Sequence, residues 1–152
     1  MIRTESEYKE AVERLEAEKV RLQQHRAHFI SLGLSEEEVE RAMQPLISFH
    51  LQLGEEVESY ERLLRGDTAE LSNLHDLGRV LVGLRIALKL SQRELAKRLG
   101  VNDSQVSRDE RNEYRGISLD RATRILDALG VEVKFQVQQP SQDPERDHSA
   151  VS

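Results

Sequence analysis

Hydrogen-bonding side chains dominate the stretch between residues 102 and 111, which reads NDSQVSRDER. Val106 is its only aliphatic residue, and all the others carry amide, hydroxyl, carboxylate or guanidinium groups. A helix used only for packing needs a wider apolar face than this. The edges of DNA bases are read by donors and acceptors of these kinds. The stretch therefore predicts a helix that hydrogen-bonds to bases in a groove.

The residues before this stretch carry the signals of two short helices joined by a tight turn. Ser91 is placed to cap the first helix, and Gly100 suits the left-handed residue that ends it. Asn102 is placed to cap the second helix, in which Val106 points to the core. Two capped helices joined in this way form a helix-turn-helix.

Residues Leu84 to Leu129 resemble the Cro/cI-type (XRE-like) helix-turn-helix family of phage repressors, bacterial regulators and antitoxins. The resemblance implies a lambda-repressor-like domain of four or five helices, in which Arg85 and Glu110 form a buried ion pair between the first and third helices. The other matching residues are Gln92, Glu94, Leu95, Ala96, Gly100, Val101 and Val106.

The same resemblance implies a function and a set of contacts. The chain would repress transcription as a homodimer on a palindromic operator in double-stranded DNA, with its two reading helices about 34 Å apart. Ser91 and Gln92 would hold a backbone phosphate at a helix N-terminus. The reading helix, which Asn102 starts, would present the remaining DNA-binding residues: Asp103, Ser104, Ser107 and Arg108 to base edges, and Gln105, Arg111 and Arg115 to phosphates.

Three features depart from the family pattern. Asp109 stands where a large apolar residue is usual, and we expect Tyr114 to supply the missing apolar contact. Asn112 replaces a glycine, and asparagine can take the left-handed conformation that the glycine provides. The loop from Asn112 to Ile117 is one residue longer than usual.

The first 66 residues predict an antiparallel helical hairpin of the coiled-coil type. Apolar residues recur seven apart from Glu5 to Ser31, and a second stripe with spacings of three and four ends at Gly66. Gly33, followed by Ser35 and Glu38 as a capping box, marks the turn. The predicted seam, through which the hairpin contacts a second copy or another partner, consists of Tyr8, Leu15, Leu22, Phe29, Val39, Met43, Leu46, Leu53, Val57, Tyr60 and Leu64.

Charge is distributed unevenly along the chain, whose net charge is −6. Residues 1–76 carry 9 basic and 17 acidic side chains, whereas residues 77–137 carry 12 and 8. A basic block in an acidic chain is the pattern expected when one module faces phosphate and another does not. The apolar stripe of the hairpin would suit a four-helix assembly with a second copy or a groove for another protein, and its acidic charge would suit a basic toxin protein.

The end of the chain predicts a short strand and then a disordered tail. Residues 131–137 alternate between apolar and polar side chains, as in a half-buried strand. Such a strand resembles the form found in some HigA-type antitoxins, and it offers a second way to dimerise. Residues 138–152 contain two prolines and few apolar side chains. The predicted fold is therefore all-α with one terminal β-strand, divided into a hairpin (1–66), a helix-turn-helix domain (67–137) and a tail (138–152).

Other classes of protein find little support. The chain has no cysteine and no apolar stretch resembling a signal peptide or membrane span, so we expect a cytoplasmic protein without membrane contact. A catalytic constellation is missing, which predicts a non-enzyme without cofactors. In an antiparallel hairpin His25 and His28 lie far from His50, so no metal site is expected, and His50 is expected to be a hydrogen-bonded residue of the seam.

These observations leave three functions open. The first is a repressor that is also the autoregulatory antitoxin of a toxin–antitoxin pair. The second is an autonomous phage-like or housekeeping repressor without a toxin partner. The third is a coiled-coil interaction protein in which DNA binding is secondary. A small basic open reading frame beside the gene would favour the first.

Overall fold

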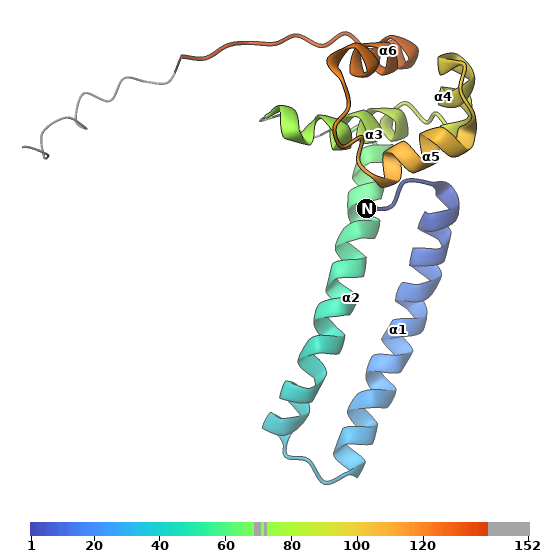
Figure 1. Ribbon diagram of the computed structural model, residues 1–152. Coiled ribbons are helices and arrows are strands. Elements are labelled where there is room, and N and C mark those ends of the chain that lie inside the picture. Colours follow the sequence, from blue (N-terminus) through green and yellow to red (C-terminus); the bar gives the residue numbers. More distant parts are fainter. Residues whose placement is uncertain (69–70, 72, 140–152) are drawn as a thin grey trace, which may run out of the picture.

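The computed structural model describes residues 1–68, 71 and 73–139, and its regular elements are helices. Two long helices, α1 (Glu5–Ser31) and α2 (Glu36–Leu64), form a hairpin that projects from a cluster of shorter helices (Figure 1). The cluster contains the 3₁₀ turn η1 (Leu74–Asp76) and the helices α3 (Leu77–Ala87), α4 (Gln92–Leu99), α5 (Asp103–Arg111) and α6 (Leu119–Leu129). In this described part of the chain, no helix is long and apolar enough to cross a membrane.

The hairpin forms where the turn signals predict it. Gly33 has a φ of 82°, and the Ser35 hydroxyl accepts a hydrogen bond from the Glu38 backbone N–H at 3.3 Å. Contacts across the hairpin fix its register: the Tyr8 hydroxyl donates to Glu61 at 2.8 Å, and Arg26 pairs with Glu40. Residues near 20 in α1 therefore lie level with residues near 47 in α2.

The predicted seam residues are covered within the single chain. Val39, Met43, Val57 and Tyr60 are buried, and the other seam residues are partly buried. A side chain that α1 and α2 already bury against each other has little surface left for a partner. His50 also differs from expectation, because its buried Nδ1 has no hydrogen-bond partner among the described residues.

One hydrophobic core runs from the base of the hairpin into the helical cluster. Ile2, Val57 and Tyr60 belong to the same set of buried side chains as Leu81 and Val82. Full burial of one large aliphatic side chain contributes about 1.5–3 kcal/mol. The base of the hairpin is thus a structural part of the helix-turn-helix region, and the helices are held in fixed positions relative to it.

The strand predicted over residues 131–137 is not formed. Val131 donates its backbone N–H to the Leu126 carbonyl at the end of α6, and residues 132–139 then run away from the helices with no backbone hydrogen bond to any other described residue (Figure 1). A strand needs a neighbour to satisfy its backbone N–H and C=O groups, and the described residues of one copy offer none. The predicted tail, apart from Gln138 and Gln139, lies outside the described residues.

Candidate nucleic-acid interface

The predicted pair of short helices is present as α4 and α5. The Ser91 hydroxyl accepts from the Glu94 N–H at 3.1 Å, and the Glu94 carboxylate accepts from the Ser91 N–H at 2.7 Å, which completes a capping box. These hydrogen bonds lower the pKa of Glu94. Gly100 ends α4 with a φ of 70°, as its left-handed position requires. Asn102 precedes α5 but caps it with no side-chain bond; instead the Asp103 carboxylate accepts from the Ser104 N–H at 2.8 Å.

Helix α5 is anchored by two residues and leaves most of its surface free. Val106 and Glu110 are buried, whereas Asp103, Ser104 and Arg108 are exposed. The helix therefore presents hydrogen-bonding groups outward while a narrow inner face fixes its position. A reading element in a DNA groove needs this combination of a firm anchor and free donors and acceptors.

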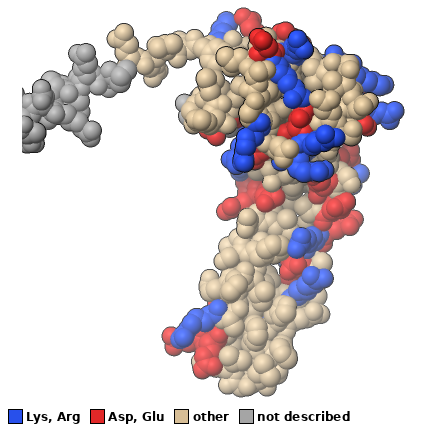
Figure 2. All heavy atoms as spheres, in the orientation of Figure 1, with Lys and Arg blue, Asp and Glu red and all other residues tan. Residues whose placement is uncertain are grey.

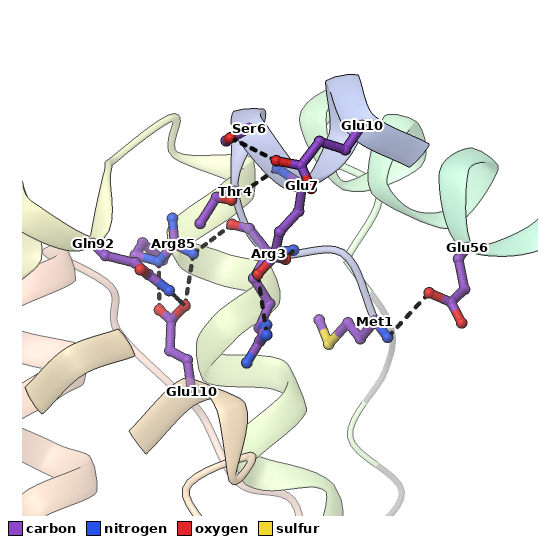
Figure 3. A network of polar contacts seen from close by, with 10 residues as sticks. All are labelled: Met1, Arg3, Thr4, Ser6, Glu7, Glu10, Glu56, Arg85, Gln92 and Glu110. Carbon is purple, nitrogen blue, oxygen red and sulfur yellow. Dashed lines mark hydrogen bonds and ion pairs between the residues drawn. The ribbon is translucent and has the colours of Figure 1, made fainter. Parts of the chain in front are cut away.

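Arg85 on α3 holds the anchor in place through four hydrogen bonds, and Figure 3 shows those to Glu110 and Arg3. Its guanidinium donates to both oxygens of the Glu110 carboxylate, at 2.5 and 2.8 Å, and both side chains are almost fully buried. It also donates to the carbonyl oxygens of Leu90 and Arg3, at 2.7 and 2.8 Å. The expected ion pair is thus present, and it ties α5 both to the turn before α4 and to the start of the chain.

Gln92 connects the two helices of the pair. Its side-chain amide donates to the Glu110 carboxylate at 2.7 Å, so Gln92 of α4 and Arg85 of α3 share one buried acceptor on α5 (Figure 3). This contact fixes the N-terminus of α4 relative to α5. Any phosphate held by the backbone N–H groups at that N-terminus would consequently be held at a defined position relative to the reading helix.

Five of the predicted DNA-binding residues lie around one surface hollow of about 860 Å³. The start of the chain also lines this hollow, through Arg3 before α1 and Lys9 within it, as do Lys89 and Arg93. No sequence signal connects the start of the chain with residues near 91, and its proximity is visible only in the folded structure. The five predicted residues around the hollow are Ser91, Gln92, Asp103, Ser104 and Ser107.

The other predicted DNA-binding residues lie outside this hollow. Gln105 lines a separate hollow beside Asp109 and Tyr114. Arg108, Arg111 and Arg115 are exposed, and their side chains have no ion-pair or hydrogen-bond partner among the residues described. Three unpaired guanidinium groups near the end of α5 make this side of the helix suitable for phosphate or for guanine edges.

The departures from the family pattern are accommodated locally. Asp109 forms an ion pair with Arg121 on α6, and Tyr114 is buried in the core as expected. Burial raises the pKa of Tyr114, whose hydroxyl has no partner in the described part of the chain. The expectation that Asn112 is left-handed is wrong, because Asn112 has a φ of −87°. The left-handed residues are instead Glu113 and Tyr114, with φ values of 52° and 49°.

The loop after α5 lies directly against α3. A Cβ atom built at Gly78 would be 1.7 Å from the Glu113 carbonyl oxygen, so only glycine fits there. We expect Gly78→Ala to lower the free energy of unfolding by about 1–3 kcal/mol, because the loop backbone must move. Chemical denaturation would measure this.

Gly54→Ala is a matched control, because a Cβ at that position in α2 meets nothing within 4 Å. In a helix interior, alanine is more stable than glycine by about 0.5–1 kcal/mol. The control should therefore raise stability. A loss of stability in Gly78→Ala together with a gain in Gly54→Ala would support the close approach at Gly78, whereas a neutral or stabilising Gly78→Ala would contradict it.

Charged side chains gather at the end of the molecule that carries the helix pair. On the face shown in Figure 2, lysine and arginine cluster over α3–α6, and much of the middle of the hairpin carries neither sign of charge. The acidic groups on this face lie mainly at the base of the hairpin and beside the basic ones. The local positive charge matches the sequence block of residues 77–137.

Comparison with known proteins identifies a family model that matches part of the chain. Residues 83–136, about a third of the chain, match the family model HTH_3, described as Helix-turn-helix. The match begins within α3 and continues past α6, so it covers the helix pair, its buried ion pair and the extended segment that follows. No curated protein and no solved structure matches the chain.

Proposed function

Because residues 83–136 are a helix-turn-helix domain of the XRE family, and hence a DNA-binding regulatory module, we propose that the chain is a sequence-specific transcriptional repressor. One observation carries the proposal. Helix α5 is anchored by Val106 and Glu110 and presents an outer surface of free hydrogen-bonding groups beside the capped N-terminus of α4. Such a repressor acts by occupying an operator in double-stranded DNA.

The proposed contacts divide between base edges and phosphates. Arg108 takes the guanine-reading role, since its guanidinium is exposed and can bond bidentately. Asp103, Ser104 and Ser107 face neighbouring base edges from the same helix. The N-terminus of α4, at Ser91 and Gln92, holds one phosphate, and Gln105, Arg111 and Arg115 hold others.

Operator binding is proposed to require two copies. A single module of this size buries too little surface and makes too few base contacts for operator specificity. A two-fold dimer places two α5 helices in successive major grooves about 34 Å apart, which makes the operator palindromic.

The test is Arg108→Ala, measured as equilibrium binding to the promoter DNA of the protein's own gene and to single-base variants of it. We expect a loss of roughly 5- to 150-fold on the intact site, corresponding to about 1–3 kcal/mol, and a relaxed preference at one position of each half-site. Arg124→Ala, an equal change of charge on α6, is the control and should weaken all sequences alike. Unchanged affinity and preference in Arg108→Ala would remove Arg108 from the base-reading role.

We propose a second function for the hairpin, that of an antitoxin binding a basic toxin protein. The supporting observation is its acidic charge together with exposed Val20, Ile30, Leu32 and Leu51, which lie outside the seam. A hairpin with a net acidic charge and exposed apolar side chains suits a basic partner.

Co-expression with the neighbouring genes and purification of the full chain tests this second function. A stoichiometric complex with a small basic protein, whose toxicity the chain suppresses, would support it. If the chain purifies alone and still represses its promoter, it is an autonomous repressor. If it forms a complex but shows no DNA preference, it is primarily an interaction protein.

A further inference from the structure

The extended segment after α6 leaves apolar side chains and backbone groups without partners. Val133, Phe135 and Val137 are 37%, 70% and 94% exposed, and they alternate with polar residues. Among the described residues, no hydrogen bond to the backbone of residues 132–139 is formed. Figure 1 shows this segment leaving the helical cluster without returning to it. It therefore has the side-chain pattern and the free edges of a strand that lacks its neighbour.

We propose that the neighbour is the same segment of a second copy of this chain, paired antiparallel about a two-fold axis through Val133. This inference rests on the proposed function, because it assigns the surface that brings two operator-binding modules together. It also explains why the strand predicted from the alternating pattern does not form in one chain.

Charge selects both the direction and the register of the pairing. In a parallel pair with equal residues opposed, Glu132 meets Glu132 and Lys134 meets Lys134, which is destabilising. In the antiparallel pair centred on Val133, Glu132 lies opposite Lys134 of the second copy, and this contact occurs twice. Moving the centre to residue 132 or 134 again opposes like charges, and a one-residue slip turns the apolar side chains to the wrong face.

The same register forms one continuous apolar face. Val131 lies opposite Phe135 of the second copy, and Val133 lies opposite its own equivalent. Val131 is partly buried against the core of its own chain, so this face starts at the core. Since a two-stranded ribbon alone is only marginally stable in water, we expect a weak dimer that operator DNA strengthens by binding both copies.

The first experiment uses the absence of cysteine from the chain. In Val133→Cys the two thiols of a dimer lie directly opposite each other, at about the 4.5–5.5 Å between Cα atoms that a disulfide spans. Mild oxidation of the full-length variant should therefore give a covalent dimer.

Val137→Cys is the matched control, because the same residue type is replaced at a more exposed position. Random collision would cross-link Val137→Cys at least as fast, whereas the proposed register cross-links Val133→Cys at least about tenfold faster. Equal rates, or faster cross-linking at residue 137, would overturn the register. A Val133→Cys variant that stays monomeric would overturn the pairing.

A charge exchange tests the pairing without cysteine. Glu132→Lys and Lys134→Glu each place like charges opposite each other twice, and each should weaken dimerisation roughly tenfold, as measured by sedimentation equilibrium. The double variant Glu132→Lys with Lys134→Glu restores the opposite charges and should restore the dimer. Failure of the double variant to recover would contradict the proposal.

The base preference of a single copy, measured on DNA that contains one half-site, does not depend on dimerisation. This measurement therefore separates the proposed pairing from the proposed repressor function. A chain that does not pair through residues 131–135 but still loses base preference on Arg108→Ala keeps its operator function and dimerises elsewhere, for instance through the hairpin. A chain that pairs as described but shows no DNA preference retains the dimer and loses the repressor assignment.

Discussion

Replacing Arg85 with alanine is expected to lower the free energy of unfolding by about 3–5 kcal/mol, because it leaves the buried Glu110 carboxylate without its ionic partner. The change also removes donors from the carbonyl oxygens of Leu90 and Arg3. For a domain whose total stability is typically about 5–15 kcal/mol, this is a large fraction. Urea denaturation followed by circular dichroism would measure it.

Arg79→Ala provides the matched control for this prediction. Arg79 lies on the same helix and also forms an ion pair, with Glu113 at 3.1 Å, but its side chain is 65% exposed. Exposed ion pairs contribute less than about 1 kcal/mol, so the control should lose little stability. Similar losses of unfolding free energy for the two variants would show that burial does not make the Arg85–Glu110 pair more important for stability than an exposed pair.

Deleting residues 1–66 is expected to unfold the helix-turn-helix region at ordinary temperatures. The deletion removes Ile2, Val57 and Tyr60 from the core that they share with Leu81 and Val82, and it takes away the Arg3 carbonyl. Newly exposed apolar surface and one lost buried contact together cost several kcal/mol, on the order of the whole stability of a small domain. Thermal unfolding monitored by circular dichroism would report the loss.

A variant with a shortened hairpin shows whether stability depends on the core residues at the hairpin base or on the length of the hairpin. Replacing residues 22–46 with a short glycine-containing turn removes the distal half but retains Ile2, Val57 and Tyr60, because residues 21 and 47 lie level across the hairpin. This variant should keep a cooperative unfolding transition and its affinity for a single half-site. A stable, cooperative fragment 67–152 would contradict the expected dependence on the hairpin base.

Local signals explain what the sequence alone could predict. Gly33 and Ser35 mark the hairpin turn, and the Ser91–Glu94 capping box with Gly100 defines the helix pair. Each of these motifs acts within a few residues, so its geometry follows from the order of residues along the chain. The Arg85–Glu110 pair was predictable only through resemblance, because its partners are 25 residues apart.

Contacts between distant residues set the limit of that prediction. Nothing in the sequence around Arg3 indicates that its carbonyl accepts from Arg85, or that the start of α1 lies beside Ser91. In the loop after α5, the approach of Gly78 to Glu113 accompanies left-handed residues at 113 and 114 and not at Asn112. The strand at 131–137 was predicted from a valid pattern, but pairing depends on a neighbour that the described part of one chain does not supply.

The contact of Arg85 with both Arg3 and Glu110 bears on how the protein is made. Residue 3 leaves the ribosome long before Arg85, which lies 82 residues later, and Glu110 follows another 25 residues on. The hairpin can form from neighbouring sequence during synthesis, whereas the reading helix obtains its buried partner only when most of the chain has emerged. A chain whose translation stops before residue 110 would therefore contain the hairpin but no functional reading helix. In a complete chain, a partner that binds the hairpin could do so during synthesis, before the reading helix is able to bind the operator.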